Sequence, residues 1–281
     1  MNHIELTHQA VLNILPDRDP HAHKGDFGRI LLLCGSRGYT GAAALAARGA
    51  LRSGAGLVYL GVPESIYAIE AVKLDEPIVF PLPDGGGKLS EAAIPEILER
   101  LRSMDAVLIG PGVGQSPGTF AVTKAVLESY PGPVVLDADG INVMAAHMDI
   151  LRGRTAPTVV TPHPGEFARM GGKSGSTVEA AVAMARDLGI IVVLKGSGTV
   201  ITNGETVYVN PTGNPGMAVG GSGDVLAGIV VSFLGQGIAP LEAAACAAWV
   251  HGASGDICAR EMGQYGMLPG DMVEALPRLL K

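Results

Sequence analysis

The chain has few charged and few aromatic residues. Of its 281 residues only 17% are charged and 4% are aromatic, whereas 47% are hydrophobic. A chain of this length and apolar content can bury a large core, so the composition excludes an intrinsically disordered protein. The formal net charge of -7 argues against nucleic-acid binding or an anionic membrane surface, because either partner needs clustered Lys and Arg residues.

Cysteine and long hydrophobic runs are scarce as well. The three cysteines, Cys34, Cys246 and Cys258, lie far apart in apolar surroundings. This arrangement favours reduced core thiols in the cytoplasm over disulfides or a metal site. Residues 1–20 lack the apolar segment of a signal peptide, and no run reaches the roughly 18 apolar residues of a membrane span. The sequence therefore predicts a cytoplasmic protein with no membrane partner.

Several familiar motifs for nucleotide binding and hydrolysis are incomplete. Gly172-Lys173-Ser174 matches only the tail of a P-loop, because Phe167 stands where the first glycine belongs. No glycine cluster completes G-x-G-x-x-G after a strand, which removes the main support for a Rossmann oxidoreductase. Asp224 replaces the last glycine of a G-x-S-x-G nucleophile elbow, and neither H-E-x-x-H nor paired cysteines occur.

Short β-branched runs, each followed by glycine or proline and then by an alanine-rich segment, repeat along the chain. The predicted strands are residues 29–34, 57–62, 106–109, 134–136, 158–161 and 190–194. The predicted helices are residues 42–52, 91–101, 119–128, 177–188, 225–234 and 242–258. Because the strands are almost continuously apolar, they suit a parallel sheet that helices cover on both faces.

Residues 199–210 break this pattern. Two short alternating runs flank Asn203-Gly204, which is the strongest signal for a hairpin with a two-residue turn. A late antiparallel hairpin counts against a closed eight-fold barrel and favours an open, mostly parallel α/β sheet. No linker divides the chain, so we expect one domain over residues 1–281, with residues 1–22 as an N-terminal arm.

Glycine-rich loops follow several predicted strands, where an open α/β sheet binds its ligands. Residues 195–199 follow one strand and could meet a nucleotide through amides, hydroxyls and an ammonium group, although this segment taken alone favours a tight strand-to-strand turn. Residues 137–142 place two carboxylates at another strand end, which suits magnesium or a helix cap. His163, between two prolines, could donate to a polar substrate or simply lie in a turn.

The stretch from Asn214 to Gly228 carries the clearest chemistry. Its glycines let the backbone turn tightly before an apolar helix and leave amides uncovered, and such amides attract anions. Asp224 stands at the start of this helix. Its carboxylate could take a proton from a hydroxyl that attacks a bound phosphate, or it could cap the helix.

Taken together, these segments resemble the ribokinase-like family of nucleotide-dependent NAD(P)H-hydrate dehydratases, which repair a hydrated, inactive form of the reduced nicotinamide cofactor. The discriminating segments are His163-Pro164-Gly165-Glu166 and residues 213–218, Gly-Asn-Pro-Gly-Met-Ala. The motif at residues 221–224 is shared with the wider superfamily of vitamin kinases, so it specifies phosphoryl transfer only. The resemblance implies a three-layer α/β sandwich with a central, mostly parallel sheet.

The resemblance also implies the reaction and its participants. ADP, or ATP, drives removal of water from the (S) hydrate of NADH or NADPH, with Mg²⁺ bridging the nucleotide phosphates. The residues implied for the hydrate site are Ala42, Gly112, Gly114, His163 and the catalytic base Asp224. Those implied for the nucleotide are Lys195, Gly196, Ser197, Gly198, Thr199 and Gly223, with Gly221, Ser222 and Gly223 as the anion hole. The metal ligands stay unassigned.

The resemblance further implies a homo-oligomer, with a tetramer as one form. Because about 20 residues before His23 leave no room for the epimerase domain of many bacterial relatives, we expect a functional link to a separate NAD(P)H-hydrate epimerase. Two alternatives stay open: a kinase for a small vitamin precursor such as hydroxyethylthiazole, and a nucleotide-binding module without catalysis.

Overall fold

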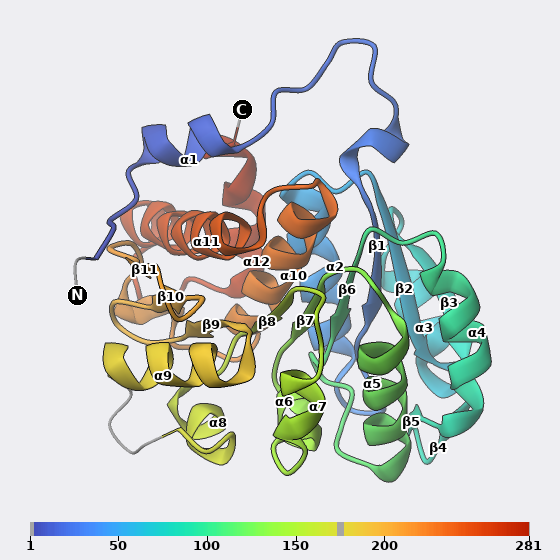
Figure 1. Cartoon of the computed structure of the whole chain (residues 1–281). Coiled ribbons are helices and arrows are strands. Elements are labelled where there is room, and N and C mark those ends of the chain that lie inside the picture. Colours follow the sequence, from blue (N-terminus) through green and yellow to red (C-terminus); the bar gives the residue numbers. More distant parts are fainter. Residues whose placement is uncertain (1–2, 173–176, 281) are drawn as a thin grey trace.

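The computed structural model of the chain describes residues 3–172 and 177–280. Lys173 and Ser174, from the rejected P-loop match, lie outside the described residues. The main sheet is formed by β1 (Arg29–Leu33), β2 (Leu57–Pro63), β3 (Ile78–Leu82), β6 (Ala106–Ile109), β7 (Val134–Leu136), β8 (Thr158–Val160), β9 (Ile191–Leu194), β10 (Val200–Thr202) and β11 (Val207–Val209). Their order is β11-β10-β9-β8-β7-β6-β1-β2-β3 (Figure 1).

The adjacent strands β9, β8, β7, β6, β1, β2 and β3 run parallel to one another. Strand β10 is antiparallel to both of its neighbours, β9 and β11. In the inner strand β1, Ile30 and Leu32 belong to the core on one face of the sheet, while Leu31 and Leu33 belong to the core on the other. All four side chains are fully buried. Apolar residues on both sides of one strand require a helical layer on each face, which explains the continuous hydrophobic runs.

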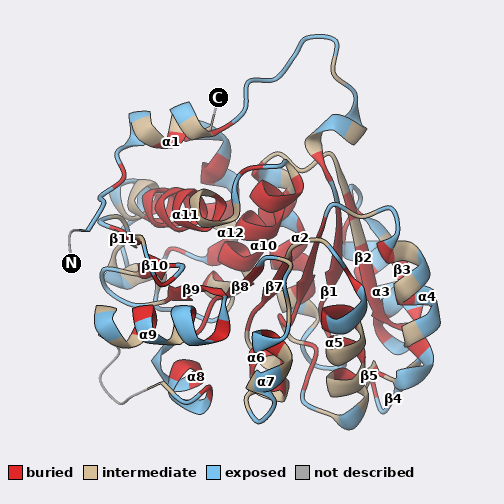
Figure 2. Cartoon of the chain, viewed as in Figure 1, coloured by how far each residue is buried: buried red, intermediate tan, exposed pale blue. Residues whose placement is uncertain are grey.

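The helices are α1 (His8–Ile14), α2 (Thr40–Arg52), α3 (Glu64–Lys73), α4 (Ile94–Leu101), α5 (Pro117–Ser129), α6 (Asp139–Met144), α7 (Met148–Arg152), α8 (Pro164–Arg169), α9 (Val178–Leu188), α10 (Ser222–Gly235), α11 (Pro240–Met262) and α12 (Pro269–Ala275). Helices α2, α10 and α11 share one core with the sheet, and α4, α5 and α9 share the other. Figure 2 shows α10 and α11 as buried elements. This confirms the predicted three-layer α/β sandwich with a mostly parallel sheet.

Two expectations about local structure were wrong. The predicted helix 91–101 divides into a 3₁₀ turn, Glu91–Ala93, and α4, because Pro95 stands in the first turn of α4, where its missing N–H costs no hydrogen bond. The hairpin is present, but its turn is longer than two residues, since Thr202 pairs with Val207. Asn203 Oδ1 accepts bonds from the N–H groups of Glu205 and Thr206 at 3.0 and 2.9 Å, and this local bonding stabilises the longer turn.

Three short strands escaped prediction. The edge strand β3 contains Pro81, which is tolerated because an edge strand leaves one row of backbone groups unpaired. A small hairpin of β4 (Asp84–Gly85) and β5 (Lys88–Leu89) follows it. This hairpin lies against the loop after β6, because Lys88 packs on Gly114.

The N-terminal arm packs across the helical layer. His8 on α1 stacks on Trp249 of α11, with 5.2 Å between ring centroids, and its Nε2 lies 3.0 Å from the carbonyl of Leu279. Cys34, Cys246 and Cys258 are free and buried, as the sequence predicted. No helix in the described part of the chain has the length and apolar content needed to cross a bilayer.

Candidate functional site

The loops that follow β6, β7, β8 and β9 meet at the carboxyl edge of the parallel strands, as expected for an open α/β sheet. Here Asp137 Oδ1 accepts hydrogen bonds from the Lys195 ammonium at 2.8 Å and from the Thr161 hydroxyl at 2.6 Å. The same ammonium lies 3.9 Å from Glu166 Oε2. Burial lowers the pKa of Lys195, but the carboxylates of Asp137, Glu166 and Asp224 outweigh burial and raise it. Lys195 is therefore positively charged at neutral pH.

Backbone strain separates the two carboxylates of residues 137–142. Ala138 has φ 48° and ψ -118°, a conformation that side chains other than glycine rarely adopt. Asp137 faces Lys195, whereas Asp139 accepts bonds from the Gly114 N–H and the Gln115 amide, each at 3.0 Å. The two carboxylates of the predicted acidic loop therefore bind donors from two different loops. Neither carboxylate caps the helix that follows, since no side chain caps α6.

Asp224 stands in the first turn of α10, and its carboxylate makes no hydrogen bond or ion pair with any described residue. The helix-capping explanation therefore fails, since α10 has no side-chain cap. Burial, reinforced by the negative charge of Asp137 and partly opposed by Lys195, raises the pKa of Asp224 to about 7. A carboxylate with that pKa can exchange protons near neutral pH, as a general base requires.

The backbone before Asp224 presents donors to an anion. Gly221, at φ 98°, precedes the first helical residue, and a Cβ there would lie 2.5 Å from Leu45 Cδ1 of α2. The amides of Gly221 and Gly223 have no acceptor within the described residues, whereas the Ser222 N–H donates to the Val219 carbonyl at 3.3 Å. Uncovered amides at the start of a long helix attract phosphate oxygens. The Ser222 amide is the weakest member of the predicted anion hole.

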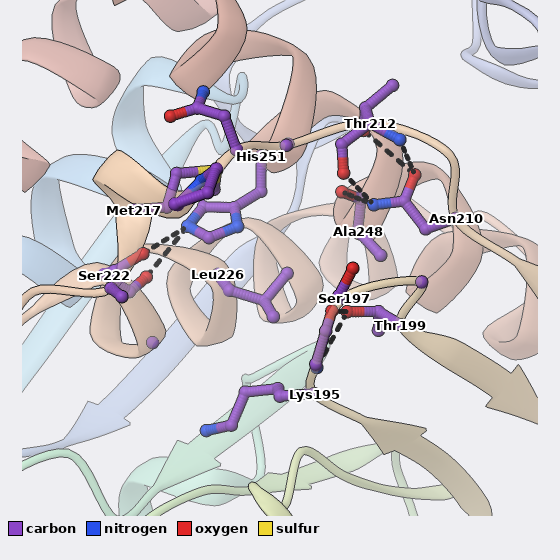
Figure 3. Close-up of a pocket in the computed structure, with 18 of the residues that line it drawn as sticks. Lys195, Ser197, Thr199, Asn210, Thr212, Met217, Ser222, Leu226, Ala248 and His251 are labelled. Carbon is purple, nitrogen blue, oxygen red and sulfur yellow. Dashed lines mark hydrogen bonds between the residues drawn. The ribbon is translucent and has the colours of Figure 1, made fainter. Parts of the chain in front are cut away.

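A cavity of about 820 Å³ opens beside this anion loop, a volume in the range of nucleotide and drug-sized ligands (Figure 3). Its walls are residues 195–199, residues 210–215 and 217–219, the start of α10 and one face of α11. The structure thus brings together the residues predicted for the nucleotide, Lys195, Gly196, Ser197, Gly198, Thr199 and Gly223. Residues 195–199 also form the turn between antiparallel β9 and β10, so the structure confirms the turn, and the nucleotide contact of this loop stays a prediction.

One face of α11 forms a wall that the sequence did not indicate. His251 Nε2 lies 2.9 Å from the Ser222 carbonyl and 3.3 Å from its hydroxyl (Figure 3). Burial lowers the pKa of His251 to about 4, so the ring is neutral and its Nε2–H donates to the carbonyl. The Asn210 amide bonds the Ala248 carbonyl at 3.1 Å, and the Thr212 hydroxyl bonds that of Trp249 at 2.9 Å. The only sequence signal was a histidine inside an apolar helix.

Asp256, one turn further along α11, fixes the segment that carries residues 213–218. Its Oδ2 accepts the Gly213 N–H at 2.9 Å, and its Oδ1 accepts the Asn214 side-chain amide at 3.0 Å. Asn214 in turn accepts the N–H of Gly216 at 3.0 Å. The discriminating motif of the family resemblance is therefore a cavity wall anchored to α11.

His163 lines the same cavity and also caps α8. Its Nδ1 accepts the N–H groups of Gly165 and Glu166 at 2.9 and 3.3 Å, while Glu166 Oε2 accepts the His163 N–H at 2.9 Å. The ring Nε2 lies 3.3 Å from Glu166 Oε1. Because Nδ1 is an acceptor, the proton is on Nε2, which is the atom able to donate to a ligand.

Ala42, Gly112 and Gly114 do not line the cavity. A Cβ on Gly112 would lie 2.8 Å from the Ala42 Cβ, so these two predicted residues are in contact. Ala42 stands one turn before Leu45, the residue that touches the anion loop. The predicted hydrate residues therefore form a separate surface on the α2 side of the anion loop, while His163 lies with the nucleotide residues.

The comparisons with known proteins agree with one another. The family described as NAD(P)H-hydrate dehydratase matches residues 30–278. The bifunctional NAD(P)H-hydrate repair enzyme Nnr of Moorella thermoacetica is 45% identical over 275 residues, which cover 95% of this chain and 52% of that protein. The enzyme of the same name from Escherichia coli is 36% identical and is covered to 50%. The chain thus spans about half the length of these relatives.

Solved structures show the same relationship. The ADP/ATP-dependent NAD(P)H-hydrate dehydratase of Bacillus subtilis, co-crystallised with ATP/Mg²⁺, has a TM-score of 0.84 and 31% identity, with 99% of this chain and 98% of that chain covered. Hydroxyethylthiazole kinase from Pyrococcus horikoshii has a TM-score of 0.59 and 18% identity, covering 85% of this chain and 94% of that chain. The second similarity extends to the fold alone.

Proposed function

Because the chain belongs to the NAD(P)H-hydrate dehydratase family, we propose that it uses an adenine nucleotide to dehydrate the (S) hydrate of NADH or NADPH. In this reaction ADP becomes AMP and phosphate, and the reduced cofactor is restored. The observation that carries the proposal is the Asp224 carboxylate, which has no bonding partner among the described residues and a pKa of about 7 beside two uncovered amides.

The geometry supports a two-step reaction. Asp224 accepts the proton of the C6 hydroxyl of the hydrate as that oxygen attacks the terminal phosphorus of the nucleotide. The bond between this phosphorus and the bridging oxygen breaks, AMP leaves, and the amides of Gly221 and Gly223 stabilise the negative charge on the transferred phosphoryl group. The ring nitrogen of the substrate then expels phosphate from C6, and loss of a proton from C5 to water forms the C5–C6 double bond of the dihydronicotinamide.

The two ligands occupy opposite sides of the anion loop in this proposal. Residues 195–199 and Gly223 bind the nucleotide in the cavity, and the Lys195 ammonium neutralises phosphate charge. Ala42, Gly112 and Gly114 contact the hydrate on the other side, and the Nε2–H of His163, which lines the cavity, contacts the hydrate where the two ligands meet. Residues Gly221, Ser222 and Gly223 form the anion hole, with the Ser222 amide contributing least because it also donates to Val219.

Magnesium fits this site only as an ion carried by the nucleotide. No group of three or more His, Cys, Asp or Glu side chains within the described residues could hold a metal. Asp137 and Asp224 are the carboxylates near the anion loop, and Mg²⁺ commonly uses one or two carboxylates together with phosphate oxygens and water. Asp137 already accepts hydrogen bonds from Lys195 and Thr161, so the nucleotide phosphates and water would supply most of the ligands, and the ion would neutralise charge on those phosphates.

Further features of the whole protein are also proposals. We propose that it is a homo-oligomer such as a tetramer, that it works in the cytoplasm, where buried free cysteines stay reduced, and that an NAD(P)H-hydrate epimerase supplies its substrate. The bifunctional names of the longer relatives support the last link. The oligomer is supported by apolar side chains exposed on α3.

A repair assay tests the proposed function. Incubation with ADP and (S)-hydrated NADH or NADPH should restore absorbance near 340 nm, and AMP and phosphate should appear in equal amounts. If the absorbance is recovered neither with ADP nor with ATP, the proposed dehydratase function is rejected. Phosphorylation of hydroxyethylthiazole in a parallel reaction would instead support the vitamin-precursor kinase, for which the fold is the only structural argument.

A further inference from the structure

A second group of ligand-binding side chains surrounds the loop after β6, outside the nucleotide cavity. Tyr39 is 62% exposed, although its Cβ would lie 3.0 Å from a Cβ on Gly112. An exposed aromatic ring next to Gly112, which also touches Ala42, enlarges the surface proposed for the hydrate. A dinucleotide needs such an extended surface, because most of the molecule lies beyond its reacting ring.

Two cations border this surface. The Arg37 N–H donates to the Gly87 carbonyl at 2.9 Å, and the side-chain stem of Arg37 passes within 2.5 Å of the position of a Cβ on Gly87. Its guanidinium makes no hydrogen bond or ion pair with the described residues and the residue is exposed. Lys88, the next residue after Gly87, runs across Gly114, where a Cβ would lie 2.7 Å from Lys88 Cε.

Neighbouring carboxylates do not neutralise these cations. Asp84, in the same small hairpin as Lys88, accepts the Ser65 N–H at 2.9 Å, and this bonding lowers its pKa. Asp139, below the loop after β6, is occupied by the Gly114 and Gln115 donors. Among the residues that the structure describes, the Lys88 ammonium donates only to the Gln115 carbonyl, at 3.0 Å. In a chain of net charge -7, these two positive groups stand without an ionic partner in the described structure.

We propose that Arg37 and Lys88 form a phosphate subsite for the dinucleotide hydrate, separate from the subsite for the adenine nucleotide. The identity of this ligand rests on the proposed function. A planar guanidinium binds a phosphate group through two parallel hydrogen bonds, and an ammonium adds a point charge. Two phosphate sources share this chemistry: the diphosphate, present in both hydrates, and the 2′-phosphate, present only in hydrated NADPH. An arginine is a common partner of the 2′-phosphate.

Steady-state kinetics of Arg37→Ala and Lys88→Ala test the subsite. We expect each KM for hydrated NADPH to rise about tenfold, because a charge-assisted bond is lost, while kcat and the KM for ADP change less than twofold. The exposed Arg102, paired with Glu99 at 3.0 Å at the carboxyl end of α4, provides the control Arg102→Ala. If the KM rises for hydrated NADPH alone, the subsite binds the 2′-phosphate. If the KM rises equally for both hydrates, the subsite binds the diphosphate.

A direct binding measurement tests this subsite independently of the catalytic activity. Fluorescence titration with NADPH itself should show the same loss of affinity in both variants, and Arg37→Lys should recover part of it. Unchanged NADPH affinity and unchanged KM values in variants that melt like the wild type would overturn the subsite, even if repair activity is present. A wild type that binds NADPH through Arg37 without repairing hydrates would reject the proposed function and retain the subsite.

Discussion

Asp224 is the residue on which the proposed chemistry depends. Replacement by Asn keeps the size and polarity of the side chain but removes the base, so we expect kcat to fall by about three orders of magnitude or more. Nucleotide affinity should change little, because residues 195–199 and the anion-loop amides are untouched. Single-turnover repair and calorimetric ADP titration of Asp224→Asn measure the two effects. Unchanged turnover would remove Asp224 from the mechanism.

The raised pKa of Asp224 predicts a pH dependence. The base is active when deprotonated, so kcat should fall as pH decreases through about 7. Burial is the largest cause of the shift and the charge of Asp137 is the second. Asp137→Asn removes the second cause, so the acid limb should move to lower pH. A pH profile between 5 and 9 measures this, and Asp149→Asn, on α7, is the control. If the acid limb of the kcat profile is at the same pH in Asp137→Asn as in the wild type, a group other than Asp224 causes the pH dependence.

His163 has two roles that two substitutions can separate. His163→Ala removes both the cap of α8 and the Nε2–H, whereas His163→Asn keeps an oxygen able to accept the Gly165 N–H. We expect both variants to raise the KM for the hydrate more than the KM for ADP. Restoration of wild-type kinetics by Asn would show that capping is the whole role of His163, and equal losses for the two ligands would place it outside the hydrate site.

At the level of single residues, the sequence predicted contacts within loops better than contacts between them. The nucleotide residues 195–199 are consecutive, so one strand end brings them together. Arg37 and Lys88, by contrast, are scattered in the sequence, and only the Gly87 contact makes them neighbours. His251 was missed for the same reason, since nothing within α11 indicates that Ser222 lies beside it.

At the level of elements, α11 anchors one wall of the cavity. Its carbonyls and side chains anchor Asn210, Thr212 and Asn214, which lie on one continuous segment of the wall. Asp256→Ala would leave the Gly213 N–H and the Asn214 amide without their acceptor. We expect the KM for ADP to rise about tenfold, while kcat at saturation is largely retained because Asp224 is not displaced.

The control for this prediction lies on the same helix. Glu261 forms an ion pair with Arg278 in which both side chains are more than half exposed, so Glu261→Ala should change the KM for ADP less than twofold. If the two variants behave alike, the effect of Asp256→Ala is a general weakening of α11. If Asp256→Ala has wild-type kinetics, the anchoring of the 213–218 segment does not matter for nucleotide binding.

The central elements were predictable because their burial dictates their composition. Strands β6 and β7 begin and end where the apolar runs predicted, since both faces of these strands are covered. The peripheral elements were not. Strand β3 contains a proline, the β4–β5 hairpin has two residues in each strand, and neither offers the periodic pattern that a longer buried element shows. The hairpin turn was mispredicted because side-chain bonding by Asn203 overrides the Asn-Gly signal.

At the scale of the whole molecule, the two proposed ligand sites lie at one edge of the sheet, on opposite sides of the anion loop. The nucleotide cavity opens toward β9, β10 and α11, while Ala42, Gly112 and the Arg37–Lys88 subsite extend toward α2 and the β4–β5 hairpin. The start of α10 lies between them, in contact with α2 through Leu45. Asp224 is therefore placed where a hydroxyl from one ligand can meet a phosphate from the other. The assignment of residues 1–281 to one domain stays a prediction.

The surface of α3 bears on the proposed oligomer. Val72 is 85% exposed and Ile69, one turn earlier, is 48% exposed, with Ile78 at 43% on the neighbouring edge strand β3. Apolar side chains grouped on an edge strand and its helix favour burial against another chain. Val72→Asp would place a charge in that contact, so we expect a smaller assembly in size-exclusion chromatography with light scattering. Tyr265→Asp, in the exposed loop after α11, should leave the mass unchanged. A monomeric wild type would reject the oligomer, and an unchanged mass for Val72→Asp would reject this face as its interface.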